Sequence, residues 1–333
     1  MSGKDRNADG TVVWNPNTRM QRAGLLVANG NVYIGFSAYG TFYPLHGWVM
    51  AYNAANVQEQ VAVYIDTLNG DRGGIWQSGG GLAADAKGNV YVVTGDGTFN
   101  GTTDFADSFL KLSARLELLD WFTPNNWKWL FEHDQDLGAT APMLFPDSNL
   151  VVGAGKEGVV FVVDRDNMGH LEGKDAGSVQ RFAATPQSYE IHSAALWTGS
   201  PNPVLYVWGW KDFLKGFRFH DGRFETEPFS SSTFGSEYPG GSITVSSDGN
   251  KSGTGIVWAT TTKLNSIVHV VPGALRAFDA MDLTRELWDS DENPGRDALG
   301  NLAKFEAPVV ADGRVYVATF SNQLDVYGLL EEK

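Results

Sequence analysis

Aromatic, charged and imidazole side chains occur in the loops that separate the apolar runs of this chain. Indole rings can stack on a sugar or another planar ligand, and lysine ammonium groups can hold a carboxylate. A carboxyl group beside a lysine or histidine can donate or accept a proton if burial shifts its pKa. The candidate ligand-binding residues of this kind are Trp76, Gln77, Asp96, His46, Lys156, Glu157, His192, Trp210, Lys211 and Lys304.

Several of these residues have a structural interpretation beside the functional one. Trp76 can equally pack one sheet against the next, and His46 can simply bond a neighbouring loop. Lys156 and Glu157 lie in the sequence GAGKEG, where a tight turn and an ion pair explain both residues. The sequence therefore indicates a binding surface and leaves the catalytic residues unassigned.

A partial calcium-loop pattern lies near the N-terminus. Asp5, Asn7 and Asp9 have the spacing of the first ligands of an EF-hand loop, but Pro16 stands where that loop needs a bidentate glutamate. The alternative interpretation is a terminal lead-in without metal. No two histidines have the i, i+4 spacing of a zinc site, so these three residues are the metal candidates.

Composition restricts the partners and the chemistry. A formal net charge of −14 repels phosphate backbones, so nucleic acid is excluded as a partner. The absence of cysteine excludes disulfides, thiolate metal sites and cysteine nucleophiles. No apolar run approaches the roughly 18 residues of a membrane helix, and the first ten residues lack a signal-peptide core, so we expect no membrane insertion.

A repeated hairpin pattern organises the whole chain. The unit is an apolar run, a turn containing Gly, Asn or Asp, and a second run rich in Val, Ile and Tyr, which predicts two paired strands. The second runs begin at Val32, Val90, Leu150, Leu205, Ile256 and Val315, at intervals of roughly 50 to 60 residues. This period is typical of propeller blades.

Further runs after each hairpin predict a third strand in all six copies and a fourth in the first five, which in the fourth copy is FETEPF (224–229). The sequence thus predicts an all-β, six-bladed β-propeller of four-stranded antiparallel blades. Residues 11–16 (TVVWNP) are predicted to complete the C-terminal blade and close the ring, which would remove exposed sheet edges. The single domain 1–333 is divided into blades at 17–72, 73–135, 136–190, 191–238, 239–300 and 301–333 plus 11–16. Helix is expected to be nearly absent: the segment 119–134 is the one stretch that could hold a short helical turn, and an inter-blade loop is the favoured interpretation.

The loops of one face surround the channel of a propeller, and function resides there. These are the loops that enter each innermost strand and those that join the second strand to the third. All ten candidate binding residues fall in such loops, together with Asp136 in an entry loop. We therefore expect them at one channel mouth.

The repeats resemble bacterial β-propellers with pyrroloquinoline-quinone-type repeats. The resemblance covers most of the chain and rests on the segments HGWVMAYNA (46–54), GGIWQSGGGLAAD (73–85), TGDGTF (94–99), VVGAGKEGVVFVVDRDNMG (151–169) and KFEAPVVADGRVYVATF (304–320). That family includes quinone-dependent dehydrogenases and scaffold propellers, and it implies an exported protein, periplasmic or extracellular. It makes pyrroloquinoline quinone and Ca²⁺ candidate cofactors.

Two features depart from the quinone dehydrogenases. Those enzymes typically carry adjacent cysteines against the cofactor, whereas this chain has none, and the segment AFDAMDLTRELW (277–288) lacks their Thr-Gly docking pair. Two functions remain open. The first is a non-catalytic propeller that binds a small polar molecule, a glycan or a peptide at the channel mouth. The second is an enzyme at the same mouth, either a quinone- or metal-assisted oxidoreductase or a carbohydrate-active hydrolase or lyase.

Overall fold

The turn-flanked apolar runs form antiparallel hairpins, as the sequence predicts. The computed structural model describes residues 12–38, 45–199, 202–249 and 251–330. In its first hairpin, β2 (Leu26–Ala28) pairs with β3 (Asn31–Ala38), and Val27 lies opposite Val32. Gly30 in the turn has a φ of +70°, a left-handed conformation that glycine adopts without a steric penalty.

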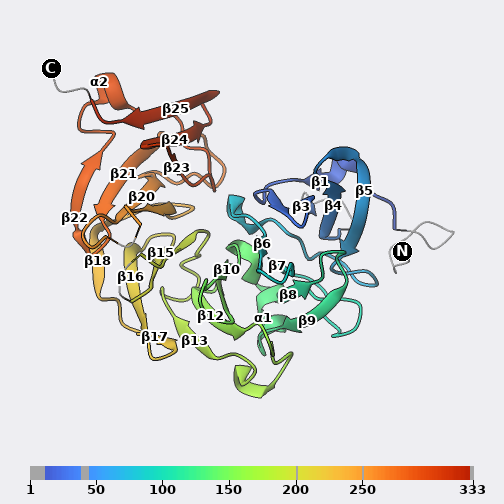
Figure 1. Cartoon of the computed structure of the whole chain (residues 1–333). Helices are drawn as coiled ribbons and strands as arrows, with labels where there is room; N and C mark the ends of the chain where they lie inside the picture. Colours follow the sequence, from blue (N-terminus) through green and yellow to red (C-terminus); the bar gives the residue numbers. More distant parts are fainter. Residues whose placement is uncertain (1–11, 39–44, 200–201, 250, 331–333) are drawn as a thin grey trace. The chain divides into compact units, whose positions relative to one another are not determined.

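The chain divides into two compact units, 1–182 and 183–333, and the first contains three sheets (Figure 1). The first sheet comprises β2, β3, β4 (Trp48–Asn53) and β5 (Asn56–Ile65), with β1 (Arg19–Met20) also paired to β3. The second comprises β6 (Ala83–Ala84), β7 (Val90–Val93), β8 (Phe109–Leu112) and β9 (Leu118–Phe122). The third comprises β10 (Met143–Leu144), β11 (Leu150–Ala154), β12 (Val159–Asp164) and β13 (Gln180–Ala183).

The second unit also contains three sheets. The first is built from β14 (Ala194–Trp197), β15 (Val204–Trp208), β16 (Phe213–His220), β17 (Arg223–Phe224) and β18 (Ser230–Gly235). The next comprises β19 (Ser242–Ser246), β20 (Ile256–Thr261), β21 (Ala274–Asp279) and β22 (Asp282–Asp289). The last comprises β23 (Val309–Ala311), β24 (Arg314–Thr319) and β25 (Gln323–Gly328). These six sequential sheets are the blades of a β-propeller, so the predicted fold class and blade number are confirmed.

The middle strands of the blades form the core. Every residue of β11 and β15 is buried. Within the first unit the second blade packs against β11, and within the second unit the fifth blade packs against β15. Continuous apolar runs such as VLYVW of β15 are therefore required, instead of alternation between apolar and polar residues. Packing of whole blades fixes the strand ends, and hence the loops between strands.

The prediction that residues 11–16 complete the last blade is wrong for the described part of that segment. Residues 12–15 are not in a strand, and Trp14 packs against the first blade. Its ring centre lies 4.6 Å from that of Phe36 and 5.4 Å from that of Trp48. These edge-to-face contacts bury the indole against the first blade, which fixes the segment there. The last sheet has three strands in the described residues.

The outer edge of the fourth blade also differs from the prediction. The segment from Phe224 was expected to be its fourth strand, but β17 covers only residues 223–224 at the end of β16. The long outer strand is β18, which pairs with β16 through Lys215–Ser231 and Phe213–Gly235 with an irregular register. The serine-rich sequence of β18 carries little apolar signal, which explains the miss.

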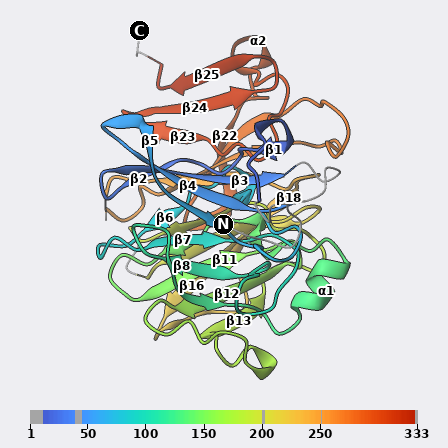
Figure 2. The ribbon, with the colours of Figure 1, turned by 90° about the vertical axis from the view of Figure 1, so that its right-hand side faces the viewer.

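Helical structure is confined to short segments of the described chain. Helix α1 (Trp127–Glu132) lies within the segment expected to be a loop, and α2 (Pro294–Asp297) is a single turn. Figure 2 shows α1 outside the sheets, beside the ends of their strands. None of the helices in the described ranges is long and apolar enough to span a membrane.

Trp208 tests the core of the second unit. Its fully buried ring lies 5.6 Å from Phe234 and 5.7 Å from Phe278, centre to centre. Removing such a ring leaves a cavity, so Trp208→Ala should lower the free energy of unfolding by about 3–5 kcal/mol in denaturant titrations. Phe213→Ala, at a side chain that is 43% exposed, is the matched control and should lower the free energy of unfolding much less. Equal losses for the two variants would contradict this packing.

Candidate functional site

A buried ion pair lies at the centre of the charged residues of the first unit. The Lys156 Nζ lies 2.5 Å from Asp136 Oδ2 and 3.2 Å from Asp134 Oδ2. Only 11% of the Lys156 side chain and 8% of the Asp136 side chain are exposed, whereas Asp134 is 78% exposed. We call Asp96, Asp134, Asp136 and Lys156 the charged cluster. It combines three carboxyl groups, of which only that of Asp134 is exposed, with one ammonium group that Asp134 and Asp136 share.

Loop geometry at the ends of two blades brings the pair together. Asp136 immediately precedes the short 3₁₀ turn Leu137–Ala139 that enters the third blade, and Lys156 follows β11. The Lys156 backbone N–H also donates to the Asp136 carbonyl, at 3.0 Å. A Cβ at Gly155 would lie 2.6 Å from that carbonyl oxygen, so only glycine permits this approach.

The carboxylate of Asp136 receives further donors from the second blade. The Asp96 backbone N–H donates to Oδ1 at 2.9 Å, and the Trp76 indole N–H donates to the same oxygen at 3.3 Å. A Cβ at Gly95 would lie only 2.4 Å from Oδ1. Burial alone opposes ionisation of Asp136, but the Lys156 ammonium and these donors outweigh it, so the pKa of Asp136 lies below its ordinary value.

Asp96 follows β7 and has the reverse shift. Its carboxylate accepts from Arg72 Nη1 at 2.9 Å, and its side chain is 14% exposed. Burial, reinforced by the nearby charge of Asp136, raises the pKa of Asp96 to about 7 although Arg72 acts against this. The pKa values of two neighbouring carboxyl groups are therefore shifted in opposite directions, and that of Asp96 lies close to neutral pH.

Asp107 lies behind the cluster and is fully buried. Its Oδ1 accepts the Leu137 backbone N–H at 2.9 Å, whereas its Oδ2 has no hydrogen-bond partner among the described residues. Burial raises the pKa of Asp107 well above its ordinary value. A protonated Asp107 holds the entry turn of the third blade without adding another negative charge.

Trp76 is a wall of the site and offers little open surface. Only 8% of Trp76 is exposed. The cationic groups of Lys156 and Arg22 lie over its ring, at 5.6 Å and 5.7 Å from the ring centre. Cation–π contact of this kind favours the charged form of both side chains. The indole therefore positions Lys156 and Asp136 instead of presenting a stacking surface.

Three of the predicted residues in the first unit thus come together, namely Trp76, Asp96 and Lys156. Gln77 is buried, and its Oε1 accepts the Val93 backbone N–H at 3.1 Å, which holds the inner end of the second blade. Glu157 accepts from Asn126 Nδ2 at 3.0 Å. His46 is fully buried in the first blade, with Nδ1 2.9 Å from the Thr67 carbonyl oxygen.

The predicted residues of the second unit lie beside aromatic rings of that unit. His192 Nδ1 lies 3.0 Å from the Pro239 carbonyl oxygen, and its ring packs against Tyr238 and Phe305. Trp210 donates to Glu237 at 3.3 Å and lies beneath the Lys211 ammonium. Lys304 donates to the Ile267 carbonyl at 2.8 Å and lies over the Tyr238 ring. These contacts hold loops of the second unit.

Sequence reasoning did not select Asp134, Asp136 and Arg72 as site residues. Asp136 was placed in an entry loop, but a lone aspartate there has no distinctive pattern. Asp134 has a left-handed backbone, with a φ of 55°, shortly after helix α1, in a segment for which the sequence favoured a loop over a helical turn. Arg72 also has a positive φ, 63°, which no local pattern signals. The glycines beside Asp96 and Lys156 were the available signal.

The acidic residues could in principle hold a cation. Carboxylate oxygens of Asp96, Asp134 and Asp136 all lie within 4.8 Å of one another. The Lys156 ammonium, however, already contacts two of these carboxylates and stands where a divalent ion would need oxygen ligands. This donor set fits an ammonium group and does not fit resident Ca²⁺. The other metal candidates, Asp5, Asn7 and Asp9, lie outside the described residues.

Comparisons with known proteins support the fold only. No protein-family model matches the chain, and no curated protein matches it. Among solved structures, a chain of a mitotic checkpoint complex is similar at 10% identity with a TM-score of 0.57, covering 95% of this chain and 81% of that one. A chain from BBS1N in complex with ARL6DN gives 8% identity, a TM-score of 0.49, and coverage of 93% and 81%. At these identities the first similarity shows the propeller fold and nothing about activity.

The pKa of Asp96 depends on its neighbour. Asp136→Asn removes a negative charge that raises the pKa of Asp96, so the Asp96 carboxyl carbon should titrate at lower pH than in the wild type, where it titrates near 7. Carbon-13 NMR of the side-chain carboxyls measures this shift directly. Asp221→Asn, at a carboxylate that is 92% exposed in the second unit, is the control and should leave the titration unchanged. An unshifted Asp96 in Asp136→Asn would refute the coupling.

The ion pair also makes a stability prediction. Lys156→Met leaves the Asp136 carboxylate buried without its cation, which should lower the free energy of unfolding by about 3–5 kcal/mol. Adding Asp136→Asn removes the orphaned charge, so the double variant should be more stable than Lys156→Met alone. Denaturant unfolding at pH 7 provides both values. A double variant less stable than Lys156→Met would show that the pair is not the dominant interaction of these residues.

Proposed function

We propose that this propeller is a binding module that takes a small polar ligand at the charged cluster of the first unit. The observation that carries the proposal is the position of the Lys156 ammonium between a buried and an exposed carboxylate. The Asp134 side chain contacts Lys156 and is 78% exposed, so a ligand can reach it from solvent. A ligand with hydroxyl or ammonium donors can bind Asp134 and Asp96, while a ligand acceptor binds Lys156.

Structural stability alone does not explain the cluster well. A buried ion pair commonly contributes less to stability than apolar side chains of the same volume, because desolvation opposes its attraction. Asp96 adds a further unfavourable term, since burial holds its pKa near 7. Shifted pKa values and paired charges at loop ends are the features by which binding and catalytic sites are recognised.

The class of ligand follows from the open groups of the cluster. The covered Trp76 leaves little surface for stacking a sugar ring, so hydrogen bonds and charge must supply the recognition. Small polar molecules, a glycan end with several hydroxyls and a peptide amino terminus all present the required donors. The resemblance to quinone-type repeat propellers supports export to an extracellular or periplasmic location, where such ligands are encountered.

A quinone-dependent oxidoreductase is not supported by the residues present. The chain lacks the cysteines that adjoin the quinone in the dehydrogenases it resembles, and the charged cluster does not fit Ca²⁺. A second candidate has one specific observation in its favour. Asp96 with a raised pKa beside ionised Asp136 is the arrangement of a proton donor and a carboxylate base, as in glycoside hydrolysis.

A ligand panel tests the proposal. Glucosamine, glucuronate, a neutral tetrasaccharide and triglycine are titrated into the full chain while backbone amide NMR shifts are recorded. We expect at least one probe to shift the amides of Asp96, Leu137 and Lys156, and Asp134→Asn to weaken its binding about 10-fold. Asp221→Asn is again the exposed-charge control and should bind as the wild type does.

The outcomes separate the two candidate functions. Binding without turnover of the tetrasaccharide favours the binding module. Release of smaller sugars, lost in Asp96→Asn and falling above pH about 7, favours the hydrolase because the protonated Asp96 is then the active form. If no probe shifts the amides of the cluster, or if Asp134→Asn binds with unchanged affinity, the charged cluster is not the binding site.

A further inference from the structure

A cavity lies at the ends of the second and third blades that are opposite to the charged cluster. The Asp85–Asn89 turn precedes β7 and the Pro146–Asn149 turn precedes β11, whereas Asp96 and Lys156 follow these strands. Between the two turns is a cavity of about 440 Å³ with Arg165 and Asp166 in its lining. This volume lies in the range of small-molecule sites, which is roughly 300–1,000 Å³.

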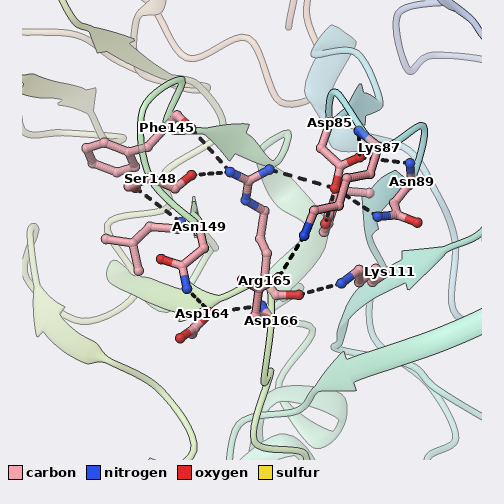
Figure 3. A network of polar contacts seen from close by, with 12 residues as sticks. Asp85, Lys87, Asn89, Lys111, Phe145, Ser148, Asn149, Asp164, Arg165 and Asp166 are labelled. Atoms are coloured by element: carbon pink, nitrogen blue, oxygen red, sulfur yellow. Dashed lines mark hydrogen bonds and ion pairs between the residues drawn. The ribbon is translucent and has the colours of Figure 1, made fainter.

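Arg165 joins the two walls of the cavity, as Figure 3 shows. Its Nη2 donates to the Phe145 carbonyl at 3.3 Å and to the Ser148 carbonyl, and its Nη1 lies 3.9 Å from Asp85 Oδ2. The side chain is only 12% exposed. The guanidinium group therefore bonds to groups of the protein itself, and these bonds hold the two turns at a fixed spacing without a ligand.

Asp85 likewise accepts hydrogen bonds from groups of the protein itself. Its carboxylate accepts from Asn89 Nδ2 and from the Tyr91 hydroxyl, each at 2.9 Å, and from two backbone N–H groups of its own turn. Burial works against its ionisation, but these donors lower the pKa of Asp85. The pair of Asp85 and Arg165 thus forms a rigid, internally neutral wall.

The remaining charges of the lining are open to solvent. The Asp166 side chain is 58% exposed and that of Lys87 is 73% exposed, with 3.5 Å between their charged atoms. Asp147 is also exposed. The lining holds three aspartates against one lysine and one arginine, so its formal charge is net negative, and it stays so when Asp85 and Arg165 are counted as a neutral pair. Leu144, Pro146 and Ala86 supply an apolar surface beside these carboxylates.

We propose that this cavity binds an organic cation, a protonated amine or guanidine carried on an apolar body. The cationic group would contact the Asp147 and Asp166 carboxylates, and the apolar body would cover Leu144 and Pro146. An anion is disfavoured because Arg165 already donates within the protein and Lys87 lies beside Asp166. The formal charge of −14 on the whole chain attracts the same class of ligand.

A free amine and a basic side chain of a peptide share this chemistry. Phenethylamine serves as the free amine, and acetyl-Leu-Lys-amide serves as the peptide form. Phenethyl alcohol and phenylpropionate are the neutral and anionic counterparts. Each is titrated into the full chain at low and at physiological salt, with backbone amide NMR shifts as the readout.

We expect a cationic probe to shift the amides of Lys87, Asn149 and Asp166, with binding that weakens as salt rises. Tighter binding of the peptide than of the amine would identify a peptide partner, and the reverse would identify a small amine. Asp147→Asn and Asp166→Asn should each weaken the binding about 10-fold. Neither change should disturb folding, since both side chains are exposed.

The matched control is Asp312→Asn, an exposed aspartate in the equivalent hairpin turn of the last blade, which should leave the affinity unchanged. Stronger binding of phenylpropionate than of phenethylamine would overturn the proposal. So would absence of shifts at the two turns, or equal affinity in Asp147→Asn. Because the amides of the charged cluster lie at the other strand ends, shifts there report separately on the proposed function.

Discussion

The buried pair between Asp136 and Lys156 is the interaction on which the arrangement of the candidate site depends. It joins the entry turn of the third blade to the loop after β11, and the Asp96 N–H and the Trp76 indole attach the second blade to the same carboxylate. A charge removed from water must be neutralised and hydrogen-bonded. Asp136 satisfies that requirement with groups from two adjacent blades, and this fixes the loops in space.

The electrostatic state of the neighbouring acids follows from that pair. Asp136 stays ionised because Lys156 lies beside it, and its negative charge then helps to keep a proton on Asp96. Burial raises the pKa of Asp107, as it raises that of Asp96. Three carboxyl groups in one region thus have three different environments. Such separation is what allows one site to both donate and accept protons or hydrogen bonds.

The fold was predictable because each blade contains the same local hairpin pattern in the sequence. Turns such as the one at Gly30, between β-branched runs, specify hairpins, and their spacing gives the blade number. The N-terminal segment was misplaced because Trp14 packs on Phe36 and Trp48, a choice between two apolar surfaces that no local pattern encodes. Strand β18 and helix α1 were missed for a similar reason, since blade packing and loop closure decide them.

The candidate site was predictable only in part. Trp76, Asp96 and Lys156 were selected because large or charged residues at strand ends are not needed for hairpin formation, and the structure brings them together. Asp136 and Asp134 can be recognised as site residues only from their contacts with residues 20 or more positions away in the sequence. The contact between Lys156 and Asp134 is one of these. Predicted residues such as Gln77 and His46 are instead used to hold backbone atoms, which sequence cannot distinguish from ligand binding.

The most direct test of this account is a high-resolution crystal structure at neutral pH that shows the position of the Lys156 side chain. The account predicts an ammonium group within hydrogen-bonding distance of both Asp134 and Asp136, with the Asp136 Oδ1 accepting from Trp76 and Asp96. A metal ion in that position, or a Lys156 side chain turned into solvent away from Asp136, would contradict it.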